Sequence, residues 1–412
     1  MHEIDLPTGF MRARQGFSEY VETNYGANPY ITDPHDMVDS NLSGIWLPKH
    51  FDTIEEVVEE YQRLQDLAKG QQGKDAQDLQ ARVEADLVRA RMFTGEEVDF
   101  YEYSEKTVGF IPVLAPIEQI DQLYGRLGDL TFVHKGFRIE SDPDRFREEY
   151  RLTDSKQINR RLGTGIHLSR MALGRRLDHL PEPVEFALQC LPDAPFSAHL
   201  ETTKHGRFTA GFNTSPARGW TAARTLLTAF HENGGHAIHA GLTQEEIDKG
   251  NINLALGLTN MTSPETAYAE VIASAAELLA VEATGTEEAR LALEIQLVLE
   301  ELKNAVFNNA NIRINLGHPE KEVVDEAAQY LPLMDRETVR SDILSGLHHP
   351  IPRANTSTYY AARELIRPLM AIKDQDVLNG SLNILYRGFF SRGETEAIIT
   401  RALEDCASSA NS

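Results

Sequence analysis

Cysteine is scarce in this sequence: among 412 residues there are only Cys190 and Cys406. Two cysteines exclude a disulfide framework and a cysteine-rich zinc site. The sequence also lacks the run of roughly 18 apolar residues that a membrane-spanning helix needs. Residues 1–14 do not have the basic and then apolar order of a signal peptide. We therefore expect a cytoplasmic protein that does not enter a membrane.

Positive charge is also in short supply, because 40 Lys and Arg residues stand against 63 Asp and Glu residues, for a formal net charge of −23. A surface of this sign repels nucleic acid phosphates and anionic lipids, so both are disfavoured as partners. The hydrophobic fraction, 41 %, is ordinary for a globular protein. The length fits two or three domains or one large helical body.

Apolar spacing predicts mostly helix. Residues 1–50 are rich in Pro, Gly, Asn and Asp and predict loop. Residues 53–67 and 76–95 then have the spacing of three and four that buries one helical face, and they predict a helical hairpin. Residues 196–214 are rich in Thr and Phe and predict a β-hairpin. Nearly everything after Trp220 predicts helix.

These segments predict a mainly-α fold: a large helical body with a deep cleft and a small β-hairpin or sheet beside the metal-binding helices. We divide the chain into an N-terminal helical region, 1–195, that forms a lid or cleft wall, and a catalytic region, 196–412. Within the second region, Gly241 is expected to end a helix, and Thr243 with Glu246 to form a capping box for the next helix.

The chemistry is carried by His231-Glu232-Asn-Gly-Gly-His236. In zinc hydrolases, the pattern His-Glu-x-x-His puts two imidazoles one helical turn apart on one face. Here the spacing is one residue longer, and in a regular α-helix five residues turn through about 500°, leaving the rings roughly 140° apart. A π-bulge returns positions i and i+5 to one face, and Gly234 and Gly235 stand where that distortion is needed.

A zinc ion held by this pair would lower the pKa of its bound water toward ~7, and Glu232 would take the proton from that water. We therefore expect His231 and His236 to be metal ligands and Glu232 to be the catalytic base.

Residues 231–240 resemble the His-Glu-x-Gly-His-Ala-x-His stretch of oligoendopeptidase F and the thermostable metallocarboxypeptidases, with one glycine inserted. The longer spacing resembles that of dipeptidyl peptidase III. A third similarity is to a bacterial family of unknown function with His-Glu-x-x-Pro-Gly-His-His, which also has a Gly-x-Phe and Asn-Thr strand like residues 206–214. The resemblance covers roughly residues 200–400. It implies one Zn²⁺ per chain and a third ligand from a glutamate on a later helix.

Two glutamates are candidates for that third ligand. Ser263 is a good N-cap and Pro264 a good first helical residue, so Glu265 lies in a first helical turn, and it is the favoured ligand by resemblance. Glu270 is the rival, because it ends a Tyr-Ala-Glu sequence similar to that of the family of unknown function. Glu277 is expected to be structural. Two His and one Glu leave one zinc position open for water.

Other groups complete the expected site. A tetrahedral intermediate needs a donor aimed at its oxyanion, and by similarity to the related peptidases we assign that role to Tyr359 or Tyr360, with His348 as a further candidate. Arg353 and Arg313 are candidates for binding a substrate carboxylate, with structural ion pairs as the alternative.

His239, about one turn beyond His236, is expected beside the ligands as a hydrogen-bonding partner or substrate contact. The β-hairpin is expected to offer an edge strand to an extended substrate.

The sequence therefore predicts a zinc-dependent hydrolase that cleaves amide bonds of short peptides or amino-acid conjugates, of carboxypeptidase or oligopeptidase type. A homodimer is compatible with the sequence. One alternative keeps the metal site and changes the substrate to a non-peptide small molecule, as in an amidohydrolase. The other is a helical binding protein in which the extra residue has abolished zinc binding.

Overall fold

The computed structural model describes residues 5–25, 38–190, 198–202, 208–216, 219–260, 263–344, 347 and 352–409. It confirms the mainly-α fold. The first helices are α1 (Leu6–Tyr25), α2 (Ile54–Ala68), α3 (Lys74–Phe93), α4 (Phe100–Val108), α5 (Ile117–Lys135), α6 (Pro143–Tyr150) and α7 (Ser155–Leu173). The later ones are α8 (Ala222–Ala229), η2 (Phe230–Ala237), α9 (Ile238–Asp248), η3 (Leu254–Gly257), α10 (Pro264–Leu279), η4 (Ala280–Ala283), α11 (Glu287–Asn315), α12 (Glu320–Tyr330), α13 (Arg336–Leu344), η5 (Pro352–Ala354), α14 (Asn355–Met370), α15 (Gln375–Leu385) and α16 (Arg392–Ser409).

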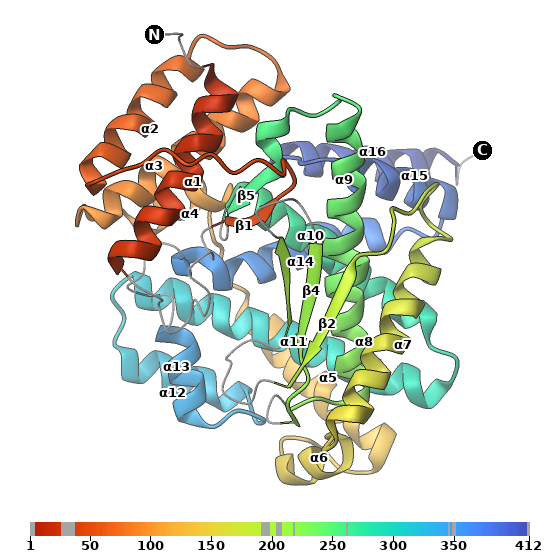
Figure 1. The fold of residues 1–412 in the computed structure, drawn as a ribbon. Helices are drawn as coiled ribbons and strands as arrows, with labels where there is room; N and C mark the ends of the chain where they lie inside the picture. The colour runs from red at the N-terminus through yellow and green to blue at the C-terminus, as the bar shows by residue number, and fades with distance from the viewer. Residues whose placement is uncertain are drawn as a thin grey trace.

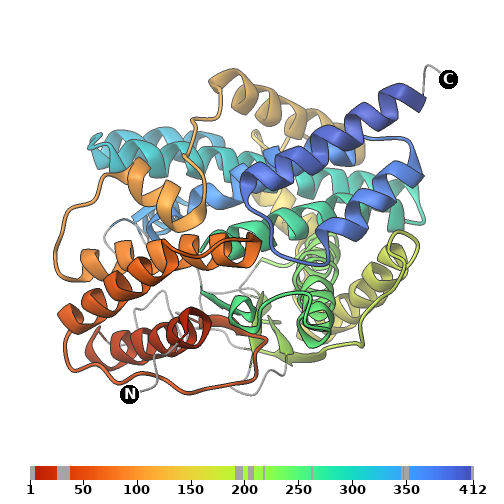
Figure 2. The ribbon, with the colours of Figure 1, turned by 90° about the horizontal axis from the view of Figure 1, so that it is seen from above.

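The predicted helical hairpin is α2 and α3, which pack against each other. Thr53 caps α2, because its side chain accepts a hydrogen bond from the backbone N–H of Glu56. The hairpin lies with α1 on one side of the molecule, and α15 and α16 lie on the opposite side (Figures 1 and 2).

The prediction of loop over residues 1–50 is wrong where α1 lies. The glycines of this segment favoured a loop over a helix, but Gly16 in α1 has a packing role. A Cβ at Gly16 would lie 1.9 Å from the carbonyl oxygen of Lys49, so only glycine lets the chain cross the helix there. Burial of one face then outweighs the weak intrinsic helix propensity of the segment.

Two small sheets accompany the helices. In the first, β4 (Phe208–Asn213) pairs antiparallel with β3 (Ala198–Thr202) and parallel with β2 (Glu185–Gln189), so the predicted hairpin is confirmed and extended by one strand. In the second, β1 (Val38–Asn41) pairs antiparallel with β5 (Leu258–Asn260). Figure 1 shows the first sheet in front of α8 and α11. The sheet therefore covers the side of the helical body on which the motif helix lies.

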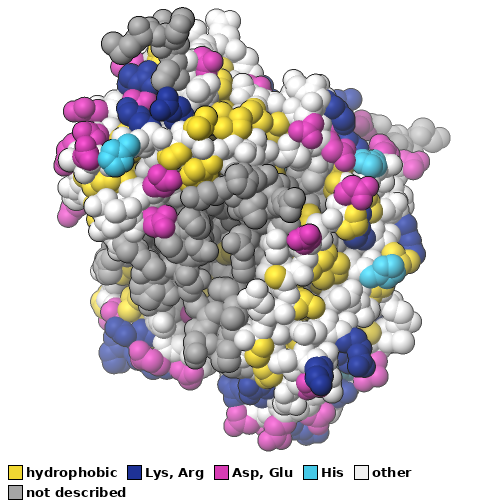
Figure 3. All heavy atoms as spheres, viewed as in Figure 1, with side chains coloured by type: hydrophobic (Ala, Val, Ile, Leu, Met, Phe, Trp, Pro, Cys, Tyr) yellow, Lys and Arg dark blue, Asp and Glu magenta, His cyan; other side chains and the backbone are white. Residues whose placement is uncertain are grey.

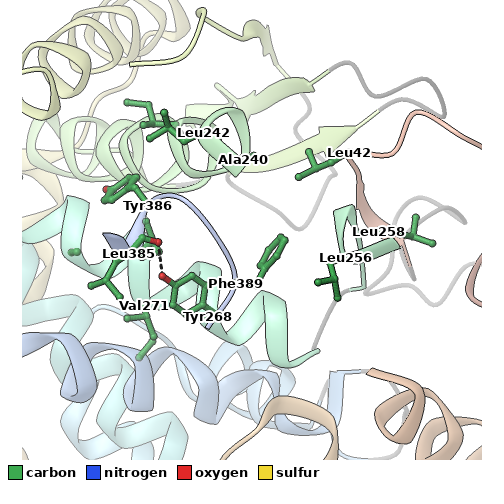
Figure 4. Close-up of a cluster of buried hydrophobic side chains, with 14 of the residues drawn as sticks. Leu42, Ala240, Leu242, Leu256, Leu258, Tyr268, Val271, Leu385, Tyr386 and Phe389 are labelled. Carbon is green, nitrogen blue, oxygen red and sulfur yellow. Dashed lines mark hydrogen bonds between the residues drawn. The ribbon is translucent and has the colours of Figure 1, made fainter. Parts of the chain in front are cut away.

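The largest apolar core cluster joins side chains from both sides of the predicted boundary at residue 195. Figure 4 shows part of it, in which Leu42 from before the boundary is drawn with Leu256, Tyr268 and Phe389 from after it. The hydroxyl of Tyr268 donates to the carbonyl of Leu385 within this cluster. The boundary between regions stays a prediction, but this core links the two regions directly.

On the face drawn in Figure 3, acidic and basic side chains alternate around the edge, so the excess of negative charge does not form one continuous block there. No helix within the described ranges is at once long and apolar enough to cross a bilayer. The deep cleft stays a prediction.

Candidate metal centre

The two motif histidines lie on a π-helical turn. Helices α8 and α9 are joined without interruption by η2, whose eight residues form a π-helix. The distortion that the extra residue predicted is therefore confirmed. It brings Nε2 of His231 to 3.1 Å from Nε2 of His236. Two imidazole nitrogens at this separation can bind one metal ion.

The glycines of the motif have a second function besides tolerating the wide turn. A Cβ at Gly235 would lie 2.4 Å from the Cα of Ala273, so only glycine lets η2 approach α10 this closely. The carbonyl of Gly234 accepts a hydrogen bond from the buried hydroxyl of Tyr386, at 3.0 Å. Close packing and this bond both hold the π-turn in place. Tyr386 is distant in sequence from the motif, and spacing analysis did not find it.

The expected helix end at Gly241 is wrong, because α9 continues through it to Asp248. A Cβ at Gly241 would lie 2.6 Å from the Cβ of Pro181, so this glycine also permits close packing. Thr243 is buried inside the helix, and the predicted capping box with Glu246 does not form.

Glu270 completes the cluster. Its carboxylate oxygens lie 3.5 Å from Nε2 of His231 and 3.4 Å from Nε2 of His236. The three ligand atoms lie within 4.8 Å of one another, which is close enough for a shared ion. Helix α10 supplies Glu270, and the contact at Gly235 sets the depth at which α10 packs on η2.

The structure contradicts the preference for Glu265 as the third ligand. Glu265 is buried and accepts a hydrogen bond from Nη1 of Arg14 at 2.5 Å, with Nε of Arg82 at 3.5 Å. Burial on its own raises the pKa of Glu265, but Arg82 and Arg14 outweigh it and lower that pKa to about 2. Glu265 therefore belongs to a buried ion-pair cluster, and its rival Glu270 lies beside the imidazoles.

The electrostatics of the site favour positive charge. Burial lowers the pKa of His231, but Glu270 and Glu277 outweigh it and raise that pKa to about 10. Burial also lowers the pKa of His236, and Glu270 reverses the direction, so the pKa is raised. The buried carboxylate of Glu232 adds to the same field. Protons and a metal ion would compete for these nitrogens.

Glu277 contacts the site, which the sequence analysis missed. Its Oε1 lies 2.8 Å from Nδ1 of His231, and its Oε2 accepts a hydrogen bond from Arg363. The available signal was the spacing, because Glu270 and Glu277 are seven residues apart and so share one face of α10. Glu277 is therefore structural, as expected, and its role is to hold the imidazole of the candidate metal ligand His231.

Tyr359 lies on the face of α14 that carries Arg363. It precedes Arg363 by four residues, and residues at this spacing lie on the same side of a helix. Arg363 pairs with Glu277 of α10, and the Tyr359 side chain is 36 % exposed. The oxyanion role of Tyr359 stays a prediction.

Tyr360 is directed elsewhere, because its hydroxyl donates to Oε1 of Gln119 on α5, at 2.9 Å. The structure therefore pairs the Tyr360 hydroxyl with α5, and this hydrogen bond does not support the oxyanion role assigned to Tyr360. His348 lies outside the described residues.

Both arginines proposed for a substrate carboxylate have partners within the protein. Arg353 donates from Nε to Oδ1 of Asn315 and from Nη1 to the carbonyl of Val98, each at 2.8 Å. Arg313 pairs with Glu326 at 2.5 Å and lines a shallow surface depression on α11 and α12. Neither lies with the cluster, so the structural alternative holds for both.

His239 is buried, and its Nε2 lies 2.9 Å from the carbonyl oxygen of Gly388. Burial lowers the pKa of His239 to about 4, so the ring is neutral and donates to that carbonyl. It packs edge-on to Tyr268 and Phe389. His239 is thus a core residue of α9, and the structure does not place it as a substrate contact.

Comparison with known proteins gives the fold and leaves the chemistry open. No protein-family model matches the chain, and no curated protein matches it. A crystal structure of a candidate lipoprotein from Colwellia psychrerythraea is similar, with a TM-score of 0.58 and 12 % identity over 87 % of this chain and 71 % of that one. A candidate lipoprotein of unknown function from Shewanella oneidensis has a TM-score of 0.54 and 12 % identity over 96 % and 83 %. At this identity the likeness concerns the fold alone.

Proposed function

We propose that the protein is a zinc-dependent hydrolase that cleaves amide bonds in short peptides or amino-acid conjugates. The observation that carries this proposal is the convergence of His231, His236 and Glu270 from the π-turn and α10, with their ligand atoms within 4.8 Å. Two imidazoles and one carboxylate are a donor set typical of catalytic zinc, and they leave a fourth position for water.

Zinc bound there would polarise the substrate carbonyl and acidify a water molecule. Glu232 directly follows a ligand and is buried, 7 % exposed, beside both imidazoles. In the proposed reaction it takes the proton from the water and later gives it to the leaving amine. Tyr359 donates a hydrogen bond to the oxyanion.

Strand β3 supports a peptide substrate in this proposal. Among the strands that the structure describes it is hydrogen-bonded on one side only, and it contacts η2 as well as β1. An extended peptide that paired with such an edge would lie along the motif helix, with its backbone held by main-chain hydrogen bonds.

The test is metal content by mass spectrometry, with peptide hydrolysis measured on the same samples. We expect about one zinc per chain in the wild type and none in His236→Ala, because two ligands hold the ion poorly. Glu232→Gln should keep its zinc and lose roughly 100- to 10,000-fold in the rate of hydrolysis, the usual contribution of a general base.

The outcomes separate the alternatives. If the wild type takes up no metal after zinc is supplied, the hydrolase proposal fails and the helical binding protein is favoured. If zinc binds but small acyl-amino acids are cleaved and peptides are not, the protein is an amidohydrolase with the same centre.

A further inference from the structure

The carboxylate of Glu277 bridges two groups that come from different parts of the chain. Oε1 lies 2.8 Å from Nδ1 of His231 on η2, and Oε2 accepts a hydrogen bond from Nη2 of Arg363 on α14. Both Glu277 and Arg363 are largely buried, with side chains 13 % and 3 % exposed. The bridge therefore joins the motif helix, α10 and α14 behind the ligand cluster.

The bridge determines which nitrogen of His231 faces the cluster. When Nδ1–H donates to Glu277, the lone pair of the neutral ring is on Nε2. That nitrogen lies 3.1 Å from Nε2 of His236 and 3.5 Å from Oε2 of Glu270. Glu277 thus selects the tautomer in which His231 can bind a metal in the cluster.

Arg363 distinguishes two glutamates that are otherwise alike. Glu270 and Glu277 lie on one face of α10, and both carboxylates are near His231. Arg363 pairs with Glu277, and among the residues that the structure describes its Nε and Nη1 have no acceptor. Because a guanidinium stays charged at any ordinary pH, it holds the Glu277 carboxylate away from the ion position and leaves Glu270 to bind there.

We propose that Glu277 and Arg363 are positioning residues of the metal site. Glu277 orients His231 and sets its tautomer, and Arg363 fixes Glu277 as a hydrogen-bond acceptor and keeps it from becoming a ligand. This inference rests on the proposed zinc site and adds two residues to it.

The experiment measures zinc affinity by competition with a chromophoric chelator for the wild type, Glu277→Gln, Arg363→Met and Arg363→Lys. In Glu277→Gln the amide is a weaker acceptor for Nδ1–H, and its NH₂ group opposes Arg363. We expect both Glu277→Gln and Arg363→Met to bind zinc about 10- to 100-fold more weakly, as is usual when a partner of a ligand is lost. Arg363→Lys should lose less zinc affinity than Arg363→Met, because lysine keeps the positive charge beside Glu277.

The matched control is Glu301→Gln. Glu301 is a buried glutamate on α11, and its Oε2 lies 3.6 Å from Nη2 of Arg367 on the same α14. Among the described residues no histidine forms an ion pair with it. The zinc affinity of Glu301→Gln should equal that of the wild type. Nitrogen NMR of the zinc-loaded wild type should show the His231 side chain protonated at Nδ1.

The results separate two failures. A wild type without zinc overturns the proposed function and this inference together. If the wild type binds zinc and both Glu277→Gln and Arg363→Met bind it with the same affinity, the inference alone is overturned. It is also overturned if the control Glu301→Gln loses as much zinc affinity as these two variants. If one variant does not fold, the zinc affinity of Arg363→Lys and the protonation state of His231 still test the proposal. A His231 side chain that is protonated at Nε2 in the zinc-loaded wild type contradicts it.

Discussion

Helix α10 carries two buried carboxylates that differ in the kind of cation facing them. Near its start, Glu265 is paired with Arg14 and Arg82. Five residues later, Glu270 faces His231 and His236. Both glutamates are buried and both pairs of partners come from other helices. We call the first group the arginine cluster and the second the histidine cluster.

The difference between them is chemical. Guanidinium groups remain charged under all ordinary conditions, so the arginine cluster neutralises its own carboxylate permanently. Imidazoles carry charge only when protonated, so the histidine cluster leaves its carboxylate dependent on protons or on a metal ion. A buried carboxylate is therefore a candidate ligand when its protein partners can give up their protons, and a structural group when they cannot.

The largest expected effect would break the arginine cluster. Glu265→Gln takes the carboxylate from Arg82 and leaves Arg14 with Asp86 as its carboxylate partner, and removing one partner of a buried ion pair costs about 3–5 kcal/mol of the free energy of unfolding. Urea unfolding measures this loss, and zinc content should remain near that of the wild type. Glu270→Gln is the counterpart: it should abolish stoichiometric zinc binding. Zinc loss in Glu265→Gln with retention in Glu270→Gln would reverse the assignment of the ligand.

The response to acid should sharpen the comparison. The pKa of Glu265 is about 2 in the folded protein against an ordinary 4.5, so its stabilising effect is complete above pH 4.5 and disappears as the pH falls toward 2. The shift corresponds to roughly 3 kcal/mol, at about 1.4 kcal/mol for each pH unit. Urea unfolding between pH 6 and pH 3 should show the wild type losing its advantage over Glu265→Gln; an advantage that is constant with pH would contradict the cluster.

The histidine cluster should respond in the opposite direction in metal-free protein. His231 has a pKa of about 10 when folded against an ordinary 6.5, so protonation stabilises the fold fully below pH 6.5 and that effect disappears as the pH rises toward 10. Added zinc should reverse the trend, because binding displaces protons and strengthens as the pH rises. Comparing unfolding with and without zinc at pH 6 and pH 9 checks both signs.

A smaller effect is expected where η2 meets α10. In Gly235→Ala the new Cβ would meet the Cα of Ala273, so the two helices must separate, at about 1–3 kcal/mol of the free energy of unfolding. Zinc affinity should fall with it, because Glu270 moves away from the imidazoles. Gly163→Ala is the control: this exposed helical glycine has nothing within 4 Å of the added Cβ and should be neutral or slightly stabilising. Equal effects at both positions would rule out the packing explanation.

The smallest expected effect is at Tyr386. Tyr386→Phe keeps the buried ring and removes the hydrogen bond to the Gly234 carbonyl, a loss of about 1 kcal/mol. Thermal unfolding with and without zinc measures it. If the bond supports the π-turn, the loss should be larger in the zinc-loaded protein; the same loss in both states would make Tyr386 an ordinary core residue.

The spacing of residues along the chain predicted the features that depend on which residues share a helical face. The extra residue between His231 and His236 was sufficient to predict a π-turn, and apolar spacing predicted the α2–α3 hairpin, because both are properties of consecutive residues. Resemblance to known families, together with the N-cap residues before Glu265, narrowed the third ligand to Glu265 and Glu270.

What the sequence could not supply was the partner of each charged side chain. Arg14 comes from a helix that was predicted as loop, so nothing near Glu265 indicated that its carboxylate was already neutralised. Arg353 was assigned to a substrate although its donors are used within the protein. Glycines were interpreted as helix ends or as backbone freedom, whereas Gly16 and Gly241 permit helices and loops to touch. Such contacts form only on folding.

The π-turn also confines the extra residue to one place in the helix. Five residues of the wide turn cover the rotation that four residues cover in an ordinary α-helix, so the helix after the turn continues in the phase of the helix before it. Deleting one glycine of the pair would therefore leave the two imidazoles on one face and His239 of α9 directed at the Gly388 carbonyl. The deletion would remove the wide turn itself, with the Gly234 carbonyl that accepts from Tyr386 and the glycine surface on which α10 packs. The insertion is thus a local change of backbone that alters the contacts of one turn and leaves the rest of the helix in register.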